Sequence, residues 1–111
     1  MDDCVFCKII NNEINSNVVY EDENFIAVHD ISPLAPVHIL VMPKKHYPTI
    51  LEVGDSKTLG DMYLLATKLA YELDVADSGF RLVVNTGIYG GQTVPHLHVH
   101  LLAGRALGGL C

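Results

Sequence analysis

The chain has 111 residues, half of them hydrophobic, and its 13 acidic and 7 basic side chains give a formal charge of −6. This length suits one domain, taken as residues 1–111, and the acidity argues against a nucleic acid polymer as partner, because that needs a basic face. No apolar run approaches about eighteen residues and the first residues are acidic, so we expect a cytoplasmic protein with no membrane partner.

Local patterns predict both helices and strands. The expected elements, in chain order, are a short helix over 4–12, strands over 18–20, 25–29 and 39–42, a long helix over 55–73, a strand over 80–85 and a strand over 93–102. Two prolines make 30–36 an irregular loop, and Pro43 stops the third strand. Short connections exclude parallel crossovers, so the pattern favours an α+β protein with a mostly antiparallel sheet.

Histidines alternate with aliphatic residues in the last of these strands. Successive strand side chains point to opposite faces, which divides this stretch into two sets. One face carries His96, His98 and His100, and the other carries Leu97, Val99 and Leu101. A row of imidazoles can meet one small anion, and the glycine-rich loop upstream lets backbone N–H groups approach it, so phosphate is the natural candidate. The alternative to a phosphate site is a metal site formed by all three imidazoles. Such a metal site would give the glycine loop no role.

Cys4 and Cys7 have the two-residue gap of a metal-binding or redox pair. The chain contains three cysteines, an odd number that argues against a disulfide framework. The alternative is that both are small buried residues without chemistry of their own.

Taken together, these stretches resemble the histidine-triad (HIT) superfamily, and within it the Hint branch of nucleoside phosphoramidases. The signature His-x-His-x-His-x-x is met by residues 96–102, and further Hint-like segments follow one another in the same order. They are 30–36, 38–46, 81–85 and 90–94. The resemblance covers residues 4–105 and implies a HIT-like fold, with a mostly antiparallel five-stranded sheet, one long helix and one short helix.

The resemblance implies a hydrolase that cleaves the P–N bond of nucleoside 5′-monophosphoramidates, with purines favoured, through a covalent nucleotidyl-histidine. His98 matches the nucleophile and His100 the donor to the phosphoryl oxygens, while His38 lies behind the triad. An imidazole with an ordinary pKa of about 6.5 has a nucleophilic nitrogen at neutral pH. Thr93 stands where many Hint proteins carry Ser. The implied catalytic residues are His38, Thr93, His96, His98 and His100.

The implied nucleotide contacts form a second set. They are Phe6, Ile9, Ile26, His29, Asp30, Ile31, Asn85, Gly91, Gln92, Thr93, Val94, His98 and His100. Asp30 matches the acceptor for the ribose hydroxyls, although an Asp here is equally typical of a turn cap. The apolar members match walls around a purine, and each is also ordinary for a core.

The resemblance implies no cofactor for the chemistry, a homodimer, and structural zinc in some branches. The zinc ligands matched are Cys4, Cys7, His46 and His96. Two alternatives to the phosphoramidase stay open. One is a dinucleoside polyphosphate hydrolase or nucleotidyl transferase of the same superfamily, and the other is a nucleotide-binding scaffold without turnover.

Overall fold

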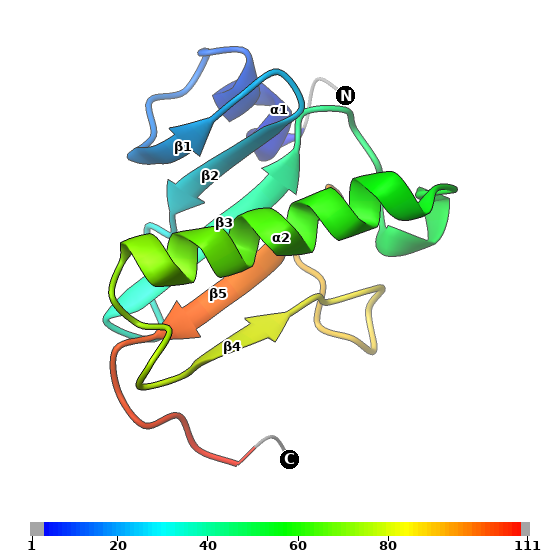
Figure 1. Cartoon of the computed structure of the whole chain (residues 1–111). Helices are drawn as coiled ribbons and strands as arrows, with labels where there is room; N and C mark the ends of the chain where they lie inside the picture. Colours follow the sequence, from blue (N-terminus) through cyan, green and yellow to red (C-terminus); the bar gives the residue numbers. More distant parts are fainter. Residues whose placement is uncertain (1–3, 110–111) are drawn as a thin grey trace.

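The computed structural model of the chain describes residues 4–109; residues 1–3 and 110–111, at the ends of the predicted domain, lie outside the described part. Figure 1 shows one sheet with a long helix across it and a short helix near its β1 and β2 end. The elements are α1 (Val5–Ile10), β1 (Val18–Glu21), β2 (Phe25–His29), β3 (Val37–Pro43), the 3-10 helix η1 (Ile50–Glu52), α2 (Ser56–Glu72), β4 (Phe80–Val83) and β5 (Val99–Ala103).

The sheet has five strands in the order β1-β2-β3-β5-β4, and every neighbouring pair is antiparallel. The predicted α+β architecture, with one long and one short helix, is therefore confirmed for the described residues. The register pairs Leu40 of β3 with His100 of β5, and His38 with Leu102. This register places His38 and His100 on the same face of the sheet at its centre.

The two faces of the sheet carry separate apolar clusters. Figure 1 shows α2 lying across one face, and the buried side of this helix packs there against alternate residues of the strands. The strand residues of this cluster include Ala27, Ile39, Val41, Val99 and Leu101. Their neighbours in sequence point the other way, and Ile26, Val28, Leu40 and Met42 pack with the α1 segment. The alternation expected from strands thus gives α2 one face and leaves the other for the histidines.

The histidine stretch differs from its prediction, because β5 begins only at Val99 and the first two histidines precede it. The ladder between β3 and β5 runs no further than Val41 and Val99. Beyond it, the N–H of Leu97 donates to the carbonyl of Tyr47 at 2.7 Å, so the local backbone bonds to a different segment. Leu97, Val99 and Leu101 are all buried on the helix face as expected, but His96 and His98 are buried as well.

The remaining boundaries shift by a few residues. Cys4 is the N-cap of α1 and lies outside the helix, α1 ends at Ile10, and β4 ends at Val83 instead of residue 85. Pro43 is the last residue of β3, where its missing N–H breaks no further ladder bond. Within residues 4–109, no helix has the length and apolar character needed to span a bilayer.

Candidate functional site

His98 is held in one tautomer by the backbone of its own segment. Its Nδ1 lies 2.7 Å from the carbonyl oxygen of His96, which only accepts, so Nδ1 carries the proton and donates. The Nε2 lone pair is then free. Burial is the main cause that lowers the pKa of His98 below 6.5, so the ring is neutral at neutral pH. The structure therefore presents a nucleophilic nitrogen in a ring that is 6 % exposed.

A second chain of hydrogen bonds fixes the tautomer of His100. The N–H of Leu34 donates to Nδ1 of His38 at 3.1 Å, so the neutral His38 ring carries its proton on Nε2. Nε2 of His38 donates to Nδ1 of His100 at 2.9 Å, which leaves the His100 proton on its own Nε2. The ring centroids of His98 and His100 are 4.8 Å apart. A nucleophile and an N–H donor thus lie side by side.

The same contacts decide whether this centre suits a metal ion. Ligand atoms of Asp30, His38 and His100 lie within 4.8 Å of one another, as a metal site requires. However, a metal on Nε2 of His38 would displace its proton while Nδ1 still accepts from Leu34, which leaves an unfavourable imidazolate. Among the described residues, His96, His98 and His100 do not form a common ligand cluster. The alternative of a metal bound by the three imidazoles together therefore lacks support.

A cavity of about 350 Å³ has Phe6 in its wall, and the ring of Phe6 contacts His98, although the triad histidines themselves are not among the lining residues. It is lined by Val5, Phe6, Ile9, Ile14, Asn15, Ser16, His29, Asp30, Ile31, Leu40, Thr93 and Val94. Seven of these are predicted nucleotide contacts, whereas the predicted wall residue Ile26 lies in the core at 2 % exposure. Leu40 could be predicted as a wall residue, because it lies two residues after His38 in β3 and therefore on the same face of the sheet. No sequence pattern marks Asn15 or Ser16.

Asp30 caps a turn and also lines the cavity. Oδ1 accepts from the N–H of Ser32 at 2.7 Å, which is a turn cap. Oδ2 lies 3.4 Å from Nε2 of His38, and the residue lines the cavity. The carboxylate is therefore oriented by the loop at the mouth of the pocket, close to the hydrogen-bonded histidines.

The glycine-rich loop is closed by side-chain amides. Gln92 accepts from the N–H of Gly87 at 2.9 Å and donates to the carbonyls of Pro48 and Val94 at 2.7 and 3.0 Å. Its side chain, matched with a phosphate contact by resemblance, is thus engaged within the protein. Asn85 donates to the carbonyl of Gly90 at 2.7 Å and keeps its amide oxygen for another partner.

Two loop glycines are required by geometry. A Cβ at Gly90 would collide with the carbonyl oxygen of Thr86, and Gly91 has a φ of +80°, which favours glycine. The loop leads directly into Thr93 and Val94, both of which line the cavity. Its backbone therefore reaches the side of the cavity near the histidines.

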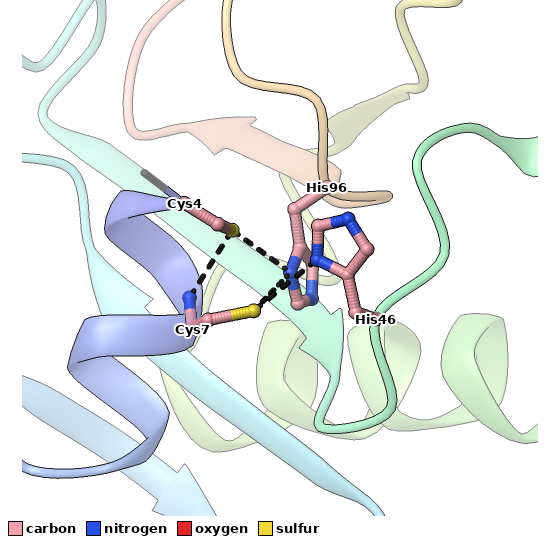
Figure 2. Close-up of side chains that lie close together, drawn as sticks. All are labelled: Cys4, Cys7, His46 and His96. Carbon is pink, nitrogen blue, oxygen red and sulfur yellow. Dashed lines mark hydrogen bonds between the residues drawn. The ribbon is translucent and has the colours of Figure 1, made fainter. Parts of the chain in front are cut away.

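Cys4, Cys7, His46 and His96 converge at the start of α1, as Figure 2 shows. Nδ1 of His96 lies 3.4 Å from Sγ of Cys4 and 3.6 Å from Sγ of Cys7. Sγ of Cys7 is 3.2 Å from Nδ1 of His46. Tetrahedral zinc with two sulfur and two nitrogen ligands requires separations of about 3.3–3.8 Å between its ligand atoms. The spacing therefore matches such a site.

The protonation states of the side chains in this cluster are also compatible with a bound metal ion. Nε2 of His96 is 2.8 Å from the carbonyl of Pro43 and must donate to it, which leaves Nδ1 unprotonated toward the sulfurs. Burial, with the neighbouring Cys4, raises the pKa of Cys7 to about 11. Without a cation the Cys7 thiol stays protonated, and a divalent metal would favour the thiolate form of its sulfur ligands. The donor set and its orientation thus fit zinc.

An antiparallel sheet with alternating histidines at its centre and an apolar pocket beside them defines a histidine-triad protein. A family model described as HIT domain matches residues 11–107, and the chain belongs to this family.

Named relatives cover nearly the whole chain. It is 45% identical over 109 residues to the purine nucleoside phosphoramidase of Escherichia coli K12, covering 96% of this chain and 92% of that protein. Among solved structures, a HIT family hydrolase from Clostridium thermocellum is 47% identical with a TM-score of 0.93, covering 98% of this chain and 96% of that one. A histidine triad protein from Clostridium difficile has a TM-score of 0.94 at 44% identity, with the same two coverages.

Proposed function

We propose that this chain is a purine nucleoside phosphoramidase, a hydrolase that releases an amine from nucleoside 5′-monophosphoramidates. The observation that carries the proposal is the arrangement at the triad, where a free Nε2 of His98 lies beside the Nε2–H of His100. The similarity to an Escherichia coli protein named purine nucleoside phosphoramidase supports the substrate class.

The proposed reaction has two steps. Nε2 of His98 attacks the α-phosphorus, a P–N bond forms to the imidazole, and the P–N bond to the leaving amine breaks. The Nε2–H of His100 donates a hydrogen bond to the phosphoryl oxygen, which stabilises charge in the transition state, and the departing nitrogen takes a proton from solvent and leaves as the amine. Water then attacks the nucleotidyl-histidine, giving a nucleoside monophosphate and free His98. The cavity holds the nucleoside, with Asp30 at the ribose and the glycine loop and Thr93 at the phosphate.

The proposal is tested by comparing turnover of adenosine 5′-phosphoramidate and a diadenosine polyphosphate by the same preparation. We expect a higher kcat/KM for the phosphoramidate, because the cavity next to Phe6 has a volume of about 350 Å³, which suits one nucleoside. Preference for the polyphosphate assigns the chain to the alternative hydrolase or transferase class. AMP binding without turnover of either substrate identifies a scaffold.

The activity is expected to persist below the ordinary pKa of histidine. Burial lowers the pKa of His98 from 6.5, and it lowers the pKa of His100 to about 4. Because the attacking ring must be neutral, activity is lost only when the pH falls through the lowered pKa. A pH profile of kcat/KM, which reports the free enzyme, should be flat from neutral pH to below about 6.5. An acid limb centred at or above that value contradicts the neutral, buried nucleophile.

We also propose one structural zinc ion per chain, held by Cys4, Cys7, His46 and His96. A cytoplasmic location, which we propose as well, would keep the thiols reduced. Zinc there would brace the start of α1 against the segment of the triad, with no part in the chemistry. The four protein ligands fill a tetrahedral site and leave no position for a catalytic water.

Elemental analysis of protein purified without chelator or a metal-affinity step should give about one zinc per chain. In Cys7→Ser the content is expected to fall close to zero and the melting temperature to decrease. Cys111→Ser is the matched control, because it removes the third thiol of the chain, which is not one of the proposed ligands. A parent protein without zinc that equals Cys7→Ser in stability contradicts the proposal.

We propose a homodimer that covers apolar surface on α2. Leu64 and Tyr71 of this helix are 67 % and 73 % exposed, and β4 is an edge strand with one neighbour among the described strands. Light scattering at micromolar concentration should report twice the chain mass of 12.2 kDa. Leu64→Glu is expected to shift the mass toward the monomer, whereas Glu23→Lys in the β1–β2 turn is not. A parent protein at the monomer mass disproves the dimer.

A further inference from the structure

The first turn of α1 joins two thiols to the proposed nucleotide pocket. Cys4 and Cys7 are both free, and their sulfur atoms lie within 4.8 Å of each other. The N–H of Cys7 donates to Sγ of Cys4 at 3.3 Å, which folds the Cys4 side chain back over the turn (Figure 2). Phe6, between them in sequence, lines the cavity.

We propose that Cys4 and Cys7 form an oxidant-sensitive modification site, at which a peroxide creates a disulfide, releases the bound zinc and weakens nucleotide binding. The proposal rests on the zinc site and the nucleotide pocket proposed above. Disulfides in reducing compartments are usually transient and regulatory, and this pair has the spacing of such redox couples.

The chemistry needs one peroxide and two thiolates. Sγ of Cys7, the less buried of the two residues, attacks one peroxide oxygen, the O–O bond breaks, and a sulfenic acid and hydroxide form. Sγ of Cys4 then attacks the sulfenic sulfur and displaces a second hydroxide, which completes the S–S bond. The two sulfurs lose two electrons to the peroxide, and two protons convert the hydroxides to water. Zinc loses both thiolate ligands and dissociates from the remaining imidazoles.

The movement that the disulfide requires is local. An S–S bond is about 2.05 Å long, so sulfurs within 4.8 Å must approach by less than about 3 Å. Cys4 has extended backbone angles as the N-cap, with φ −80° and ψ 110°, and α1 has only six residues. The change therefore falls on the first turn of a short helix and leaves the sheet in place.

That first turn contacts both the nucleophile and the nucleoside cavity. The ring of Phe6 meets His98 edge-on with centroids 4.9 Å apart, and it meets His96 at 5.9 Å. Val5, Phe6 and Ile9 form one wall of the cavity. The carbonyl of His96 holds Nδ1 of His98, so a shift of the His96 backbone on loss of zinc would also displace the nucleophile. Oxidation at the thiols is therefore transmitted to nucleotide binding.

The test uses the full chain loaded with zinc and carrying Cys111→Ser, so that only one thiol pair remains. Hydrogen peroxide is added in steps, and three quantities are followed: intact and peptide mass, zinc released to a chromogenic chelator, and AMP affinity by calorimetry. We expect loss of two hydrogens in the peptide that contains residues 4–7, one equivalent of zinc, and AMP binding weaker by about tenfold or more. Dithiothreitol with added zinc should restore all three. Cys7→Ser, as matched control, should form no disulfide and show no peroxide-dependent change in AMP affinity.

Two results overturn the inference: peroxide that leaves both thiols free or converts them to sulfinic acid, and a disulfide that leaves AMP affinity unchanged. The reversal by dithiothreitol within the parent chain decides the question even if Cys7→Ser folds poorly. None of these measurements uses turnover, so a protein inactive on phosphoramidates refutes the proposed reaction while the mass and AMP titrations still decide the modification.

Discussion

His98→Ala is expected to lower the turnover of an AMP phosphoramidate by about 10⁴-fold or more, with AMP affinity changed by a small factor. The reason is that the proposed mechanism assigns the attack on phosphorus to Nε2 of His98 alone, whereas we propose that the cavity, Asp30 and the glycine loop share the binding of the nucleotide. Steady-state kinetics and AMP calorimetry on the same preparations measure the two effects separately.

A covalent intermediate gives this assignment a second, independent check. Parent protein quenched during turnover should carry the mass of one nucleotidyl group on the peptide that contains His98, and the alanine variant should carry none. His100→Ala serves as the companion variant, because it removes a donor and leaves the nucleophile, so the adduct should still form but more slowly. Near-parent turnover in His98→Ala would disprove the mechanism.

The sequence predicted the fold well because short apolar runs separated by turn residues mark the strands, and a three-and-four spacing of apolar residues marks the long helix. The helix pattern between Asp55 and Leu73 predicts α2 to within one residue at each end, since Asp55 is its N-cap and Leu73 its C-cap. The prediction placed the start of the last strand too early, at residue 93, whereas β5 begins at Val99. The local sequence pattern does not contain the reason. His96 and His98 alternate like strand residues, but the backbone there bonds to Tyr47, a partner set by tertiary structure.

The site was predictable in its residue types but not in its hydrogen bonds. Spacing and resemblance selected the triad, the pocket and the zinc ligands. The structure brings the four predicted zinc ligands together and places seven of the predicted nucleotide contacts around one cavity, but Asn85, Gly91 and Gln92 are not among the residues that line it. The proton positions depend on three backbone groups that carry no sequence signal. They are the N–H of Leu34, the carbonyl of Pro43 and the carbonyl of His96. The full internal bonding of Gln92 likewise follows only from the folded loop.

The hydrogen bond from His38 to His100 should be worth about 10²-fold in kcat, because it keeps the donated proton on the outer nitrogen of His100. Without it, the His100 ring is free to adopt the other tautomer, whose Nε2 accepts and cannot donate to the phosphoryl group. His38 is 3 % exposed and also accepts from Leu34, so a plain truncation would disturb packing as well as chemistry.

Two near-isosteric variants separate these effects. In His38→Asn the amide oxygen can occupy the place of Nδ1 and accept from Leu34, but no donor reaches His100, so stability should be nearly kept and kcat should fall by about 10²-fold. In His38→Gln the amide nitrogen can occupy the place of Nε2 and donate to His100, so kcat should recover much of this loss while thermal stability falls, because the N–H of Leu34 loses its acceptor. Melting temperature, kcat and AMP affinity are measured for both. Equal kcat in the two variants, or parent-like kcat in His38→Asn, would show that the His38 to His100 bond does not set the protonation used in turnover.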